Sequence, residues 1–257
     1  MVTGEKKGVL GIDIGGSGIK GALVDVGQGV LVEKRFQVKT PTPSTPNSVA
    51  KVVASIVEHF DYKGPIGCTF PSIIQNGIAL SAANVDDSWI GTDIVNLFCN
   101  ATRQSVHVLN DADGAGVAEM VFGAGRDESG VVCMLTLGTG IGSALFIGSQ
   151  LVPNTELGHL ELNGRDIESW VAPRVLKNAN LNWKRWAYRV CEYLQHLEFL
   201  FSPDLFIIGG GVSRVSNKFV PYLKVKAAIV PALLGNEAGI VGAAYLASQT
   251  PKISGKI

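Results

Sequence analysis

The sequence has little charge, and the charge it has is balanced. Its 257 residues include 22 Lys and Arg against 22 Asp and Glu, so the formal net charge at pH 7 is zero. A balanced chain does not create the basic field that draws nucleic acid or an anionic membrane to a protein. Neither is therefore expected as a partner, although a local basic strip remains compatible with binding a polyanion.

Cysteine is also scarce. Cys68, Cys99, Cys133 and Cys191 are scattered, mostly among apolar neighbours, and form no C-x-x-C pair. We therefore expect four reduced and largely buried thiols rather than a disulfide framework. The sequence shows no secretory signal peptide and no apolar run of membrane-spanning length. A cytoplasmic location is expected, with a cleaved organellar transit peptide left open as the alternative.

Glycine, by contrast, is abundant, with 31 residues. The segment GVLGIDIGGSGIKGALVD, residues 8–25, contains G-x-G-x-x-G at positions 16–21. A dinucleotide-binding turn must open into a helix. Here a VGQG turn follows at once, and the apolar alternation over residues 30–38 predicts further strands, broken near residues 33–35. The glycines are therefore expected at a hairpin tip, which we call the first tip, where backbone N–H groups can crowd around a phosphate.

The same pattern returns in the middle of the chain. Residues 131–152, VVCMLTLGTGIGSALFIGSQLV, again predict strand, glycine tip, strand, turn and strand. We call this glycine turn the second tip. Further strands are predicted at residues 64–70, 105–110, 204–211 and near 227–230, and helices at about 46–60, 112–122, 183–201 and 236–248. Two such copies imply two similar α/β lobes, residues 1–115 and 116–235, with a last helix at about 236–250 packing back on the first lobe.

The helix predicted at 183–201 carries three basic residues beside its apolar stripe, namely Lys184, Arg185 and Arg189. Such residues commonly form a solvated face. The alternative is that these residues form a basic surface that binds a polyanion, and the sequence leaves both interpretations open.

The glycine tips suggest phosphate chemistry. Asp13 ends the strand before the first tip, where a carboxylate would repel phosphate unless Mg²⁺ lay between them. Thr139 adds a hydroxyl donor to the second tip. A third glycine run, IIGGGVS at 207–213, lies between a strand and a predicted helix. It fits either a tight turn or a site for adenosine or the far end of a phosphate chain. Each tip alone fits an ordinary hairpin, but matching positions in two repeats favour function.

Polar residues gather at predicted strand ends and loops as three pairs: Asn84 with Asp87, Asn110 with Asp111, and Glu156 with His159. Such side chains supply the donors and acceptors that a hexose needs, and one carboxylate must orient the attacking hydroxyl and accept its proton. Asn110 and Asp111 also fit a plain helix N-cap. After His159 come no cysteine and no second histidine at short spacing, so a sugar-binding role is favoured over a zinc ligand.

Segments across nearly the whole chain resemble the ROK sugar kinases of the actin-like ATPase superfamily. The matching segments are GIDIGGSGIKGALVD, TPxPxTP, AANVDDSWIGT, LNDADGAG, LTLGTGIGSAL, PNTELGHLE, PDLFIIGGGVSR and AGIVGAA. GGSGIKG and VDDSWIGT lean towards the polyphosphate glucokinase branch. NGRDIESW replaces the C-x-C-G-x-x-G-C zinc loop of the wider family, which supports that branch, so no zinc is expected. The resemblance implies a two-lobed, ribonuclease H-like α/β fold from a duplicated β-β-β-α-β-α unit, with a cleft between the lobes.

The resemblance also implies an activity and its residues. The enzyme would transfer a phosphoryl group from inorganic polyphosphate, or ATP as well, to the 6-hydroxyl of glucose, with Asp111 as the base, and it would form a homodimer. Glucose would be held by Asn84, Asn110, Glu156, His159 and Glu168. The donor phosphates and Mg²⁺, the latter held by Asp13 directly or through water, would be surrounded by Asp13, Gly15, Gly16, Ser17, Lys20, Thr139, Gly140, Gly209, Gly210 and Gly211.

Three alternatives differ from this prediction. A strictly ATP-dependent ROK hexokinase would share the fold and lack the polyphosphate activity. A non-catalytic sugar sensor is disfavoured by Asp13, Asp111 and both tips, and only about ten residues precede the first tip, too few for the helix-turn-helix of ROK repressors. A filament-forming actin-like ATPase is disfavoured by the cluster of sugar-type polar residues.

Overall fold

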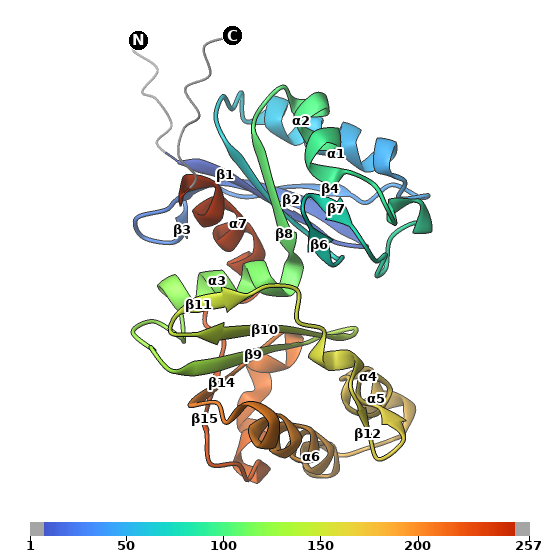
Figure 1. Cartoon of the computed structure of the whole chain (residues 1–257), viewed down its shortest axis with the longest axis vertical. Coiled ribbons are helices and arrows are strands. Elements are labelled where there is room, and N and C mark those ends of the chain that lie inside the picture. The colour runs from blue at the N-terminus through green and yellow to red at the C-terminus, as the bar shows by residue number, and fades with distance from the viewer. Residues whose placement is uncertain (1–7, 250–257) are drawn as a thin grey trace. The chain divides into compact units, whose positions relative to one another are not determined.

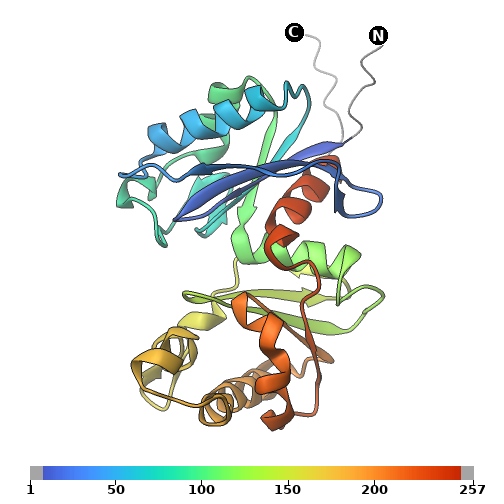
Figure 2. The same ribbon diagram turned by 180° about the vertical axis from the view of Figure 1, so that it is seen from behind.

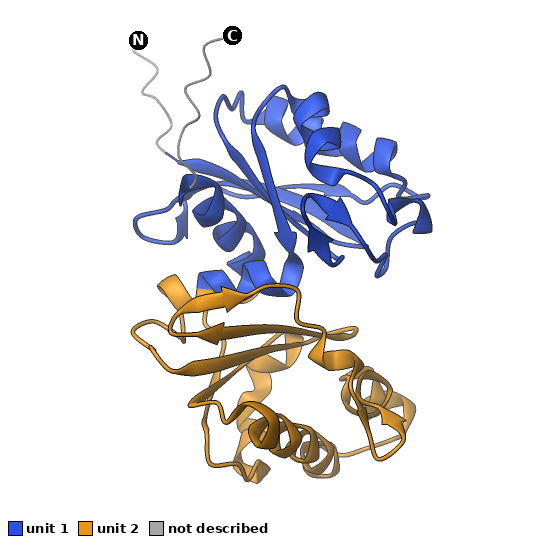
Figure 3. Ribbon diagram, in the orientation of Figure 1, with its two compact units in different colours: residues 1–118, 237–257 blue, residues 119–236 orange. Residues whose placement is uncertain are grey.

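The computed structural model describes residues 8–249, which form two compact units (Figures 1 and 3). The chain enters unit 2 after Ala118 and returns to unit 1 at Glu237. Unit 1 therefore combines both ends of the described chain, and unit 2 is one continuous segment. The sequence predicts these boundaries after residues 115 and 235.

Unit 1 is built on a mixed sheet in the order β3-β2-β1-β5-β8, with β4 also paired to β2. β1 and β2 form an antiparallel hairpin around the first tip, while β5 and β8 run parallel to β1. The alternation breaks where expected, because β3 ends and β4 begins on either side of residues 32–35. The strands are β1 (Val9–Ile14), β2 (Gly18–Asp25), β3 (Val30–Leu31), β4 (Phe36–Lys39), β5 (Ile66–Phe70) and β8 (Val106–Asn110).

Helices cover both faces of this sheet (Figures 1 and 2). A Cβ atom at Gly11 would lie 2.0 Å from the carbonyl oxygen of Ile240 in α7, and one at Gly21 would lie 2.4 Å from Ile56 in α1. Gly21 pairs with Ile12 across the hairpin, so these two residues face the same side of the sheet. Gly11 precedes Ile12 in the strand and therefore faces the other side. The other elements of unit 1 are α1 (Pro46–His59), β6 (Ile74–Gln75), β7 (Ile78–Ala79), η1 (Asp87–Trp89), α2 (Ile94–Thr102), α3 (Asp111–Phe122), which continues into unit 2, and α7 (Ala238–Gln249).

Unit 2 repeats the same topology, with sheet order β11-β10-β9-β14-β15. β9 and β10 form the antiparallel hairpin around the second tip, and β14 and β15 run parallel to β9. The duplicated sheet expected from the sequence is therefore confirmed. These strands are β9 (Val131–Leu137), β10 (Ile141–Ile147), β11 (Gln150–Val152), β14 (Leu205–Gly209) and β15 (Ala228–Pro231).

The helix predicted over residues 183–201 is found with those bounds as α6 (Trp183–Phe201). Its apolar stripe, including Trp186 and Leu194, is buried in the core of unit 2. The segment after the third glycine run differs from the prediction, because it is a short 3-10 stretch interrupted at Val215 rather than a regular helix. The remaining elements are η2 (Leu157–His159), β12 (Glu161–Leu162), β13 (Arg165–Asp166), α4 (Ile167–Val171), α5 (Arg174–Asn178), η3 (Gly211–Lys218), η4 (Val220–Tyr222) and η5 (Gly235–Glu237).

The four cysteines are free thiols, and only Cys99 is partly exposed. Burial raises the pKa of Cys133 to about 12 and that of Cys68 further still, so these thiols stay protonated and unreactive. The expectation of reduced, largely buried thiols is confirmed. Among the described helices, none combines the length and the apolar character that crossing a membrane requires.

Candidate active site

The first tip, residues 15–17, is a tight turn held by its surroundings. The Gly15 N–H donates to the Gly18 carbonyl oxygen at 3.1 Å, and the Thr40 hydroxyl donates to the Gly15 carbonyl oxygen at 2.6 Å. A Cβ atom at Gly16 would lie 2.9 Å from the carbonyl oxygen of Asn84, which itself has a left-handed backbone with φ of 62°. The fold thus brings Asn84, predicted to hold sugar, against a glycine predicted to hold phosphate.

Asp13 lies where β1 ends, beside the first tip. Its Oδ1 accepts a hydrogen bond from the Thr69 hydroxyl at 2.9 Å, and its Oδ2 lies 3.3 Å from the Lys20 ammonium. Lys20 is its cross-strand partner in the β1–β2 register. Within residues 8–249, no cluster of three or more His, Cys, Asp or Glu side chains is arranged to hold a metal ion. A lone carboxylate still fits Mg²⁺, which commonly binds one or two carboxylates and completes its shell with water and substrate phosphates.

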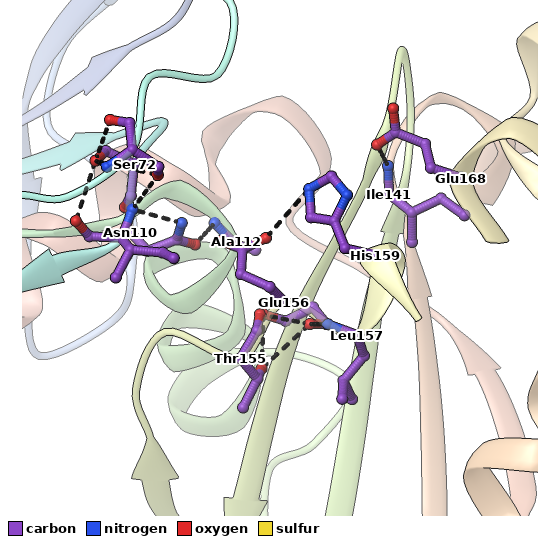
Figure 4. Close-up of polar contacts among 12 residues, drawn as sticks. Ser72, Asn110, Ala112, Ile141, Thr155, Glu156, Leu157, His159 and Glu168 are labelled. Carbon is purple, nitrogen blue, oxygen red and sulfur yellow. Dashed lines mark hydrogen bonds and ion pairs between the residues drawn. The ribbon is translucent and has the colours of Figure 1, made fainter. Parts of the chain in front are cut away.

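Asn110 and Asp111 lie at the junction of β8 and α3. The Asn110 Oδ1 accepts from the N–H groups of Ala112 at 2.8 Å and Asp113 at 3.2 Å, while its Nδ2 donates to the Ser72 carbonyl oxygen at 3.2 Å (Figure 4). Asn110 is thus a buried helix cap, one of the two interpretations of the sequence, and its amide has a second hydrogen beyond these bonds. Asp111 is exposed in the first turn of α3.

The second tip, residues 138–140, is held by two charged side chains of the same unit. The Gly138 N–H donates to the Gly140 carbonyl oxygen at 3.0 Å, and the Ile141 N–H donates to Glu168 Oε2 at 3.0 Å (Figure 4). Arg174 donates to the Thr139 carbonyl oxygen at 2.5 Å and to Glu168 Oε1 at 3.0 Å. Glu168, predicted to hold sugar, is therefore joined to the tip predicted to hold phosphate.

Glu156 and His159 lie on one turn around η2. The Ser143 hydroxyl of β10 anchors this turn by donating to the Thr155 carbonyl oxygen and accepting from the Leu157 N–H. His159 Nε2 lies 3.9 Å from Glu156 Oε2 (Figure 4). Burial raises the pKa of Glu156, the charge of His159 lowers it and the nearby charge of Glu168 raises it, so that the pKa lies above its ordinary value.

The third glycine run lies against the strand that leads into the second tip. Gly210 has a φ of 77°, and a Cβ atom there would lie 2.2 Å from the carbonyl oxygen of Leu137. Gly209 ends β14, whose register places it beside Thr136 of β9, and Gly211 begins η3. The run is therefore a tight strand-to-3-10 turn, and this geometry is compatible with both interpretations of the sequence.

The basic residues of α6 do not share one environment. The Arg189 guanidinium packs 3.4 Å from the centre of the Trp170 ring, and Arg165 lies 4.4 Å from the same ring. Burial, together with the charge of Arg165, lowers the pKa of Arg189. Lys184 and Arg185 are exposed. Arg189 therefore belongs to a packed cation–aromatic cluster and not to a plain solvated face.

Sequence reasoning missed three residues of these clusters. Thr69 and Thr40 support Asp13 and Gly15, and Arg174 supports the second tip. The one sequence signal is Thr69, a hydroxyl inside the apolar strand IGCTF. Arg174 is 35 residues away from Thr139 along the chain, and no spacing rule connects them.

Comparison with known proteins identifies the family. The family model described as the ROK family matches residues 9–174. Over 235 residues the chain is 47% identical to the polyphosphate glucokinase of Mycobacterium tuberculosis, covering 91% of this chain and 89% of that protein. The chain belongs to the ROK family. The resemblance stated from the sequence is thereby confirmed.

Two solved structures agree with the fold. The inorganic polyphosphate/ATP-glucomannokinase of Arthrobacter sp. strain KM matches with a TM-score of 0.88 and 48% identity, covering 94% of this chain and 98% of that one. The ROK family glucokinase of Streptomyces griseus, solved with glucose and AMPPNP, matches with a TM-score of 0.79 and 26% identity, covering 94% and 99%. The predicted α/β fold of the actin-like ATPase type is therefore confirmed.

Proposed function

We propose that this ROK protein is a polyphosphate glucokinase, which transfers a phosphoryl group from inorganic polyphosphate to the 6-hydroxyl of glucose. The observation that carries the proposal is the 47% identity to the Mycobacterium tuberculosis polyphosphate glucokinase across 91% of the chain. The match to the Arthrobacter polyphosphate/ATP-glucomannokinase supports the same donor, and supports ATP as a second donor.

In this proposal Asp111 aligns the attacking hydroxyl and accepts its proton. A carboxylate is a weak base towards an alcohol, but phosphoryl transfer has a loose transition state in which the proton can leave late. The exposed position of Asp111 at the start of α3 suits contact with a substrate. Asn110 orients this segment as a helix cap and offers its remaining amide hydrogen to glucose, and Asn84 adds a further polar contact.

The donor phosphates are proposed to contact both tips and the third glycine run. Gly15, Gly16 and Ser17 offer backbone N–H groups in unit 1, Thr139 and Gly140 in unit 2, and Gly209, Gly210 and Gly211 follow β14. Lys20 contributes positive charge beside Asp13. Mg²⁺, held by Asp13 through water or directly, would neutralise charge on the transferring phosphate. No zinc is proposed, because the chain lacks the cysteines of the family's zinc loop.

Glucose recognition in unit 2 is proposed for Glu156, His159 and Glu168. The first two lie 3.9 Å apart and combine an acceptor with a donor, which suits adjacent sugar hydroxyls. Glu168 is already held by Ile141 and Arg174, so it meets the sugar in a fixed orientation. A homodimer and a cytoplasmic location are proposed from the resemblance alone, and light scattering of the purified protein tests the dimer.

A donor panel tests the proposed function. Purified protein is incubated with glucose and Mg²⁺ and with polyphosphate or ATP, and the sugar phosphate formed is measured, with mannose as a second acceptor. We expect glucose 6-phosphate from polyphosphate, and none when Mg²⁺ is chelated. Product from ATP alone would identify an ATP-dependent ROK hexokinase. Glucose binding without product from any donor would identify a sugar sensor.

A further inference from the structure

We infer that Arg174 is a positioning residue, which sets the orientation of the second tip and couples it to the sugar-binding carboxylate Glu168. The inference rests on the proposed function, because it assumes that the tip binds donor phosphate and that Glu168 binds glucose. Arg174 begins α5, whereas the second tip joins β9 to β10 and Glu168 lies in α4. One guanidinium thus joins three segments of unit 2.

The first step concerns the two peptide groups of the tip. In a trans peptide the C=O and the following N–H point in opposite directions. Arg174 holds the Thr139 carbonyl oxygen at 2.5 Å, so the Gly140 N–H of the same peptide is directed away from the guanidinium. In the next peptide, the Gly140 carbonyl oxygen accepts from Gly138 and the Ile141 N–H donates to Glu168. Arg174 and Glu168 each fix one peptide group.

The second step is that the peptide groups of the tip need side chains outside the tip to hold their orientation. Glycine has no Cβ atom, so peptides around Gly138 and Gly140 rotate more freely than others. A Cβ atom at Gly140 would lie 2.4 Å from Glu168 Oε2, so a larger residue there would require the Glu168 carboxylate to move from its present position. The rigidity therefore has to come from outside the tip. In unit 1 the Thr40 hydroxyl holds the Gly15 carbonyl oxygen in the same manner, at 2.6 Å.

The third step concerns charge. Glu168 accepts through both oxygens, from Arg174 at 3.0 Å and from the Ile141 N–H at 3.0 Å. The fork of a guanidinium can donate to a carbonyl and a carboxylate at once, whereas a lysine ammonium has no such planar geometry. The Arg174 side chain is 42% exposed and that of Glu168 is 23% exposed, so substrate can reach both. A sugar that contacts Glu168 and a phosphate that contacts the tip then act on one connected network, and each changes the other's affinity by the same factor.

The test compares Arg174→Gln, Arg174→Lys and a matched control, Lys177→Gln, which removes an exposed charge from the same helix. For Arg174→Gln we expect kcat/KM for the donor to fall by about 10- to 100-fold, because a misplaced tip misaligns the phosphate. The glucose Kd measured without donor should change far less. Arg174→Lys should recover only part of the loss, and Lys177→Gln should match the wild type.

Two further measurements separate positioning from structural damage. Added guanidinium ion should restore donor use to Arg174→Ala. In Arg174→Gln, calorimetry should find that glucose changes the affinity for AMPPNP or tripolyphosphate by a smaller factor than in the wild type. Unchanged donor kinetics in Arg174→Gln would overturn the inference, as would an equal loss of glucose binding, donor use and thermal stability without rescue. A wild type inactive with every donor defeats the proposed function instead, so the two failures are distinguishable.

Discussion

Asp111 combines three features that suit a catalytic carboxylate. It is exposed, it lies in the first turn of α3, and its neighbour Asn110 caps that helix. Asp111→Asn keeps the side-chain shape and an oxygen that can accept from the Ala112 N–H, as Asp111 Oδ1 does at 2.9 Å. We expect kcat to fall by about 100- to 10,000-fold, the usual contribution of general base catalysis. Steady-state kinetics measures kcat, and calorimetry should find glucose binding largely intact.

The control for this variant is Glu128→Gln, which neutralises an exposed acid in the loop before β9. It should leave kcat within about twofold of the wild type, as is usual for surface changes remote from the chemistry. Near-wild-type turnover in Asp111→Asn would remove Asp111 from the role of base, whatever the control does.

Glu156 makes stability depend on pH in a predictable direction. Its pKa in the folded protein is raised above the ordinary value of 4.5, mainly by burial, so the folded state binds this proton more tightly than the unfolded state. The free energy of unfolding that Glu156 contributes is therefore largest below pH 4.5 and is lost as pH rises through the folded pKa. Glu156→Gln should gain stability relative to the wild type as pH rises through that window. Urea unfolding of both proteins across it measures the difference, and a difference that shrinks with rising pH would contradict the assignment.

At the scale of elements, α7 sits unusually close to the sheet of unit 1. A Cβ atom at Gly67 of β5 would lie 1.8 Å from the carbonyl oxygen of Ala243, which is backbone and cannot move aside. Gly67→Ala should therefore separate helix from sheet and lower the free energy of unfolding by about 1–3 kcal/mol or more. Gly211→Ala is the matched control, because a Cβ atom there meets nothing within 4 Å. Urea denaturation compares the two, and equal stability would mean that the close approach does not constrain the fold.

The same elements explain what could be predicted from the sequence. The glycine hairpins, the repeat and α6 follow from periodicity, which reports buried faces and needs no knowledge of distant contacts. The short elements between residues 157 and 178 have too few residues for a period, and they were not predicted. For the site, periodicity and the family resemblance suggested the candidates but not their partners. Arg174 meets Thr139 only through tertiary packing, and the helix cap made by Asn110 can be identified only from its hydrogen-bond partners.

At the scale of the whole molecule, the chain passes between the units twice. A buried carboxylate at the first residue of unit 2 is hydrogen-bonded to the segment just before the chain leaves that unit. Glu119, the first residue of unit 2, accepts from the Ala124 N–H at 2.9 Å and from the Leu234 N–H at 2.7 Å. Leu234 lies just before the return to unit 1 at Glu237. The two ends of unit 2 are thus fixed together by one side chain with no exposed surface. Removing it would leave two partly buried N–H groups without their acceptor, which destabilises the folded state.

This arrangement predicts that the two units differ in their ability to fold alone. Unit 2 is continuous and has its own core, with its ends joined through Glu119, so a fragment of residues 119–236 should fold cooperatively. A fragment ending at residue 118 lacks α7 and exposes the sheet face around Gly11 and Gly67, so it should remain unfolded until residues 237–257 are supplied. Circular dichroism and the dispersion of amide proton signals show whether each of the two fragments is folded. Glu119→Ala in the full-length protein should lower its free energy of unfolding by about 2–5 kcal/mol, because the N–H groups of Ala124 and Leu234 lose their acceptor and a cavity opens at the buried Glu119 side chain. A 119–236 fragment without dispersed amide signals would mean that unit 2 depends on unit 1 for its stability.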